Sequence, residues 1–105
     1  MMMITMYSFI TNFGVDTTWK DLFDKLIKAF KEMGVRTYVS ANGKGFVAFN
    51  ENDVVTVKFS DYEIEIRVFT DVKDAMNAMA LLDTVLDDAG IDINKFNITI
   101  DSCTR

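Results

Sequence analysis

The sequence has no histidine, no proline and a single cysteine, Cys103, which lies two residues from the C-terminal end. Without histidine, no side chain has an ordinary pKa near neutrality, and neither a Ser-His nor a Cys-His nucleophile can form. One cysteine allows no disulfide within the chain, so the fold has no disulfide scaffold. Together these absences disfavour an enzyme, and we predict no catalytic residue.

Motifs that hold cofactors or metals are also lacking. The glycines and lysine of residues 42–45 do not have the spacing of a phosphate-binding loop. The acidic segment 87–94 lacks the alternating ligands and the glycine of a calcium-binding loop. We therefore expect the chain to bind neither a cofactor nor a metal.

Positive charge is scarce. The net charge is -5 and the isoelectric point is about 4.5, which disfavours nucleic acids and anionic membrane surfaces but permits a basic protein partner. Lysine outnumbers arginine by 8 to 3, and asparagine and isoleucine are frequent. This composition is typical of AT-rich genomes, such as those of viruses and mobile elements.

Long hydrophobic runs are absent as well. Residues 1–10 are apolar, but they fall far short of the roughly 20 residues of a spanning helix. They also lack the basic start and the small-residue cleavage site of a signal peptide. We read them as part of a buried first strand, and we expect a cytoplasmic protein in which residues 1–105 form one domain.

What the sequence does contain is a regular succession of elements. A helix over residues 18–33 is predicted by a capping threonine, an apolar stripe and the closing Gly34. A second helix is predicted over residues 72–89, between Asp71 and Gly90. Period-two patterns and turn residues predict six strands, over residues 4–13, 35–40, 45–49, 53–59, 62–69 and 96–100.

Two tight turns predict how the middle strands pair. Asn42-Gly43 places Tyr38 opposite Val47 and Arg36 opposite Phe49, whereas Ser60-Asp61 places Lys58 opposite Glu63. The result is an α+β fold of order β-α-β-β-β-β-α-β, a mostly antiparallel sheet with two helices on one face. This order resembles the helix-grip and TATA-binding-protein-like arrangements, and a ferredoxin-like sheet with an extra hairpin is the alternative.

Two surfaces are candidates for function. The predicted pairing places an apolar patch with one cation on the uncovered face of the sheet, and such patches often mark interfaces. The second helix is strongly acidic and could dock on a basic groove, although solvated charge explains it equally well. The interface candidates are therefore Arg36, Tyr38, Val47, Phe49 and Val54 on the sheet, and Asp74, Leu81, Asp83, Asp87 and Asp88 on the second helix.

Three functions are compatible with these features. We favour a non-enzymatic, acidic protein-interaction module that binds a protein partner, for instance a basic one, or a second copy of itself. An inhibitor of a host protein, encoded by a virus or mobile element, is one specific form. One alternative is a helix-grip domain that binds a small apolar molecule in a cavity filled by Met6, Met33, Met76 and Met79. The other is a sheet that stacks nucleic-acid bases, which the acidity disfavours.

Overall fold

The computed structural model describes residues 3–12 and 18–104 of the chain. The order of the strands and α-helices is the predicted one, and two short 3-10 turns, η1 and η2, are added to it. The elements are β1 (Met3–Asn12), α1 (Trp19–Glu32), β2 (Arg36–Val39), β3 (Gly45–Phe49), β4 (Asp53–Phe59), β5 (Glu63–Asp71), η1 (Val72–Asp74), α2 (Ala75–Asp88), η2 (Ile93–Lys95) and β6 (Asn97–Thr104).

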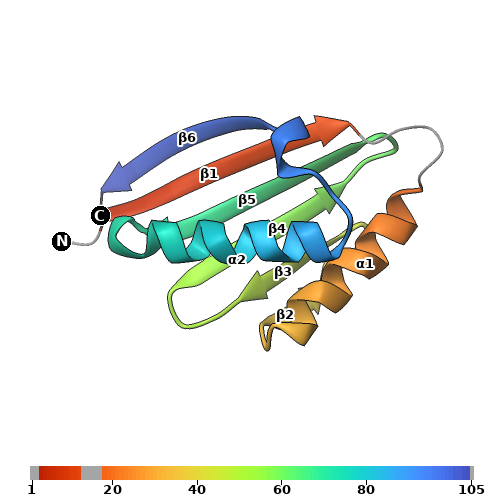
Figure 1. Ribbon diagram of the computed structural model, residues 1–105, viewed down its shortest axis with the longest axis horizontal. Helices are drawn as coiled ribbons and strands as arrows, with labels where there is room; N and C mark the ends of the chain where they lie inside the picture. The colour runs from red at the N-terminus through yellow and green to blue at the C-terminus, as the bar shows by residue number, and fades with distance from the viewer. Residues whose placement is uncertain (1–2, 13–17, 105) are drawn as a thin grey trace.

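The six strands form one antiparallel sheet in the order β2-β3-β4-β5-β1-β6, and both helices lie on the same side of it (Figure 1). This confirms the predicted fold class. If β3 and β4 are set aside, the remaining elements follow the β-α-β-β-α-β order of ferredoxin-like domains, with β1 between β5 and β6.

The connections explain why one face is covered and the other is not. β1 and β2 run parallel to each other, as do β5 and β6, and a helix links each pair. Such crossovers are almost always right-handed. Because β1 and β5 run in opposite directions, and the two crossovers step in opposite directions across the sheet, right-handedness places both helices on the same face. The opposite face is left without a helix.

Helix α1 begins and ends as its sequence predicts. The Thr18 side chain accepts a hydrogen bond from the Asp21 N–H at 3.3 Å, and Gly34 takes a positive φ of 77° just past the C-terminal end. The apolar stripe faces the sheet, where Phe30 meets Phe46 edge to face with ring centroids 5.7 Å apart. The N-terminal cap, the glycine after the C-terminal end and the buried apolar stripe are therefore all as the sequence predicts.

Several predicted boundaries and one predicted pairing differ from the structure. Strand β5, for instance, continues to Asp71 instead of ending at residue 69. The second helix starts as the 3-10 turn η1, and its α-helical part begins only at Ala75. The last strand is longer than predicted and continues to Thr104, so Cys103 belongs to a strand rather than to a frayed tail. Phe13, where the first strand was expected to end, lies outside the described residues.

The predicted register is right for one hairpin and wrong for the other. Tyr38 does lie opposite Val47, but Lys58 lies opposite Glu65 rather than Glu63. The turn is Asp61-Tyr62 instead of Ser60-Asp61, closed by a 2.9 Å hydrogen bond from the Ser60 N–H to the Glu63 carbonyl. A slip of two residues leaves every side chain on its predicted face, because the side-chain period of a strand is two.

Candidate interaction surface

A continuous row of apolar side chains crosses the sheet face opposite the helices, which we call the open face. Phe49 on β3 pairs with Val54 on β4, Val54 pairs with Phe69 on β5, and Phe69 pairs with Met6 on β1. Directly paired residues on one face touch each other. Two further side chains lie in the adjoining row, and together the six form what we call the apolar band: Met6, Tyr38, Val47, Phe49, Val54 and Phe69.

The rings at the β2 end of the apolar band are packed against each other and remain open to solvent. Tyr38 and Phe49 stack with centroids 5.4 Å apart and an interplanar angle of 11°. Tyr38 is 58% exposed, and Val54 near the middle of the band is 39% exposed. Exposed, preassembled apolar side chains of this kind are typical of interaction surfaces.

All five sheet candidates therefore lie together, because Arg36 pairs with Phe49 at the outer end of the row. The predicted patch omitted two members of the apolar band, Phe69 and Met6. Met6 joins the band because β1 lies beside β5, a pairing between strands far apart in the sequence. The only signal for Met6 in the sequence was that β1 is apolar on both faces.

The charged side chains of the open face are balanced in sign. Arg67 and Glu65 form an ion pair with Nε and Oε1 2.8 Å apart, and Lys58 lies directly opposite Glu65 across the strands. Glu63, Asp71 and Arg36 share the same face, so its described side chains include three cations and three anions. The acidic excess of the chain thus lies elsewhere, chiefly along α2.

Two hollows flank the β3–β4 turn at one end of the apolar band. One, of about 340 Å³, is lined by Gly34, Arg36, Phe49 and residues 50–51. The other, of about 250 Å³, is lined by Ile4, Val54, Phe69 and neighbouring residues of the turn and of β5. Both hollows are open to solvent and adjoin band residues, so the open face is uneven at this end.

The helix candidates do not form a comparable surface. Asp83, Asp87 and Asp88 are exposed, as predicted. Leu81, in contrast, is partly buried and packs against the hydrophobic core. It is partly buried because the apolar arc that α2 presents to the sheet is broad enough to reach this position.

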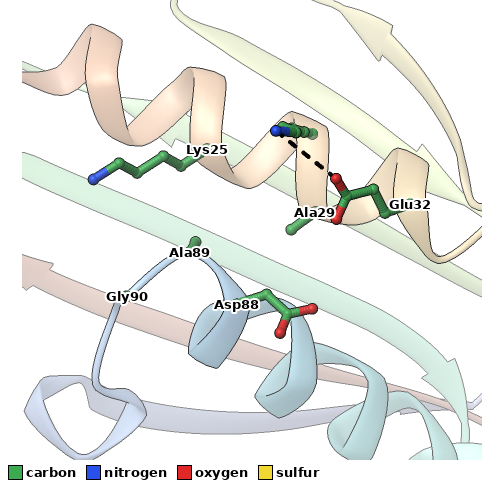
Figure 2. Close-up of a pocket in the computed structure, with 7 residues that line it drawn as sticks. Lys25, Ala29, Glu32, Asp88, Ala89 and Gly90 are labelled. Carbon is green, nitrogen blue, oxygen red and sulfur yellow. Dashed lines mark ion pairs between the residues drawn. The ribbon is translucent and has the colours of Figure 1, made fainter.

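A polar groove separates the helices near the C-terminal end of α2 (Figure 2). Its volume is about 340 Å³, and it is lined by Lys25, Lys28 and Glu32 of α1 and by Asp88 of α2, together with small residues. Lys28 and Glu32 form an exposed ion pair 3.9 Å apart. Both signs of charge line the groove, but this ion pair lies within α1 and is exposed to solvent, so it contributes little to stability.

One acidic residue is buried on the covered face, and sequence reasoning missed it. Asp53 is 6% exposed and accepts a hydrogen bond from the Thr70 hydroxyl. Burial raises the pKa of Asp53, and neighbouring Asp74 raises it further, while the hydrogen bond from Thr70 opposes the rise. The available signal was its place in the inward-facing set of β4, which continues with Val55 and Val57. Asp74 is consequently a half-buried partner of Asp53, not part of the exposed helix surface.

The four methionines expected in a ligand cavity do not lie together. Met76 is 87% exposed and Met33 is 45% exposed, whereas Met6 belongs to the open face. Only Met79 packs against the core. In the described part of the chain, the space between helices and sheet is occupied by side chains such as Phe30, Phe46 and Ile66, which are at most 1% exposed.

Within the described ranges 3–12 and 18–104, no group of three or more acidic or cysteine side chains is placed to hold a metal ion. Neither helix in those ranges has an apolar stretch long enough to cross a bilayer.

Comparison with known proteins gives a likeness in architecture alone. No family model and no curated protein matches the chain. Solved structures that match include PA4090 from Pseudomonas aeruginosa, with 10% identity and a TM-score of 0.48 over 96% of both chains. Another is a domain of unknown function, DUF77, from Bacillus cereus, with 15% identity and a TM-score of 0.39 over 99% of this chain and 77% of that one. Likeness at this level carries no information about function.

Proposed function

We propose that this protein is a non-enzymatic interaction module that binds a protein partner through the open face of its sheet. The apolar band carries the proposal, because it sets half-exposed aromatic and aliphatic side chains next to one another across five strands. Burying these side chains against a partner would remove them from water, at roughly 25 cal/mol for each Å² of apolar surface. Polar side chains border the band, as they border the core of many interfaces.

Two further parts of the proposal concern the setting in which the module acts. A cytoplasmic location is supported by a chain with one cysteine, since proteins of oxidising compartments commonly rely on paired cysteines. A virus- or mobile-element-encoded inhibitor of a host protein is one specific form of the proposal. It is supported by the small size of the chain, its acidity and an amino-acid composition typical of AT-rich genomes. Either form would use the same apolar band.

The test is affinity purification from cells that express the protein naturally. We would compare tagged wild type with Phe49→Glu, which places a charge inside the apolar band, and with Met76→Glu, which adds the same charge to an exposed side chain on α2. Wild type and Met76→Glu should retain a protein that Phe49→Glu loses, because a charge in the centre of an interface is strongly unfavourable.

Circular dichroism would establish that Phe49→Glu still folds. Identical sets of bound proteins for all three variants would contradict the proposal, because the open face would then contribute nothing to binding. Loss of the partner in Met76→Glu as well would assign binding to the helix side of the molecule.

A further inference from the structure

We infer that the partner on the open face is a second copy of this chain, so that two copies pack sheet against sheet with their helices outermost. This inference rests on the proposed function and adds the identity of the partner. Three properties of the described surface support it: the distribution of charge, the position of the helices and the area of the face.

The charge of the open face differs from that of the molecule. The chain as a whole carries a net charge of -5, whereas the described side chains of the open face include Arg36, Lys58 and Arg67 against Glu63, Glu65 and Asp71. A basic partner would be drawn to the acidic side of the molecule, around α2. A nearly neutral face with both signs suits an acidic partner that brings the same balance, and a second copy brings it by symmetry.

The position of the helices removes the main obstacle to pairing two acidic chains. In a sheet-to-sheet dimer both helix layers face outward, so the exposed carboxylates Asp83, Asp87 and Asp88 of one copy lie far from those of the other. Packed sheets are about 10 Å apart and each helix adds another 10 Å, which gives a separation of roughly 30 Å. That distance is about three times the screening length at 0.1 M salt, so repulsion between the two helix layers is weak.

The area of the face agrees with a weak but specific dimer. Six strands at about 4.8 Å spacing give a width of about 25 Å, and strands of about seven residues give a similar length. Two such faces cover roughly 1,200 Å² in total, at the lower end of the range for specific interfaces. We therefore expect a monomer–dimer equilibrium that depends on protein concentration, not a permanent dimer.

The first experiment is sedimentation velocity on the purified full chain over a wide range of concentrations. Wild type should shift from monomer to dimer as the concentration rises. Val54→Glu should weaken association by at least about tenfold, because Val54 lies within the band between Phe49 and Phe69. Met76→Glu should dimerise as wild type does. If Val54→Glu fails to fold, Tyr38→Glu replaces it, since Tyr38 is 58% exposed.

The salt dependence gives a second readout with a definite sign. Added salt screens the repulsion between two acidic chains while apolar contacts persist, so the dimer should become tighter as ionic strength rises. A dimer that weakens as ionic strength rises would be held mainly by charge pairs instead of by the apolar band, which would overturn the inference that the band joins the two copies.

Two other outcomes would overturn it. A dimer that persists unchanged in Val54→Glu would not use the open face, and pairing through the edge strand β2 would be the natural reason. A protein that stays monomeric at every concentration has no second copy as partner. The proposed function would survive that result if the affinity purification still showed a different protein lost by Phe49→Glu, and it would fail together with the inference if nothing were lost.

Discussion

The two faces of the sheet are built from the same strands but have different environments. Phe46, Val57 and Ile66 on the covered face are at most 1% exposed, while Val54 and Tyr38 on the open face are 39% and 58% exposed. Both faces are rich in apolar residues, so composition alone does not distinguish them. What distinguishes them is that both helices cross on one side, and the comparison shows that an apolar strand face is not by itself a buried one.

The largest expected effect on stability is the truncation of a phenylalanine on the covered side of the sheet, compared with the truncation of one on the open face. Phe30→Ala should lower the free energy of unfolding by about 3–5 kcal/mol, because Phe30 is fully buried against Phe46 and its removal leaves a cavity. Phe69→Ala on the open face should cost about 1 kcal/mol at low protein concentration, where only the half-buried part of the ring is lost. Denaturant unfolding of both variants measures the difference, and equal costs would break the distinction between the faces.

An intermediate effect is expected at Gly45, where the backbone of the sheet limits the sequence. A Cβ at this position would lie 2.5 Å from the carbonyl oxygen of Val57, and a backbone atom cannot move aside as a flexible side chain can. Gly45→Ala should therefore cost about 1–3 kcal/mol. Gly43→Asn is the matched control, since Asn tolerates the positive φ of 72° at that turn and meets nothing within 4 Å. Similar thermal melts for the two variants would contradict this account.

The smallest expected effect concerns Asp53, the buried acid of the covered face. Its pKa is raised in the folded state, mainly by burial. The folded state therefore binds the proton more tightly than the unfolded state does. The stability that this group contributes is present below the unfolded pKa of about 3.9 and is lost as the pH rises through the folded value.

Asp53→Asn should remove the loss of stability that accompanies deprotonation of Asp53. The amide oxygen can still accept the hydrogen bond from Thr70, and no charge is buried. Compared with wild type, the variant should gain on the order of 1 kcal/mol at pH 7. The gain should shrink as the pH falls through the raised pKa of folded Asp53 and should no longer change below the unfolded pKa of about 3.9. Asp83→Asn on the exposed side of α2 is the control and should change stability by less than about 0.5 kcal/mol. A gain that does not vary with pH would show that packing, not the proton, is responsible.

Local signals predicted the elements that depend on short-range interactions. Thr18, the apolar stripe and Gly34 marked the bounds of α1, and Asn42-Gly43 predicted the register of the first hairpin. The second hairpin was predicted two residues out of register, because Ser60, Asp61 and Tyr62 offer two turn positions of similar quality. The partial burial of Leu81 was not predicted for a related reason, since a helical wheel shows the direction of a side chain but not the width of the surface that meets it.

The sequence by itself determined the order of the elements, the bounds of α1 and the face of the sheet to which each side chain belongs, because capping, turns and the period of a strand act over a few residues. Only the tertiary structure decided that β1 lies between β5 and β6, which side the helices cover and, as a result, that Met6 extends the apolar band. These outcomes depend on contacts between distant segments and on the handedness of two crossovers, which no short stretch of sequence encodes.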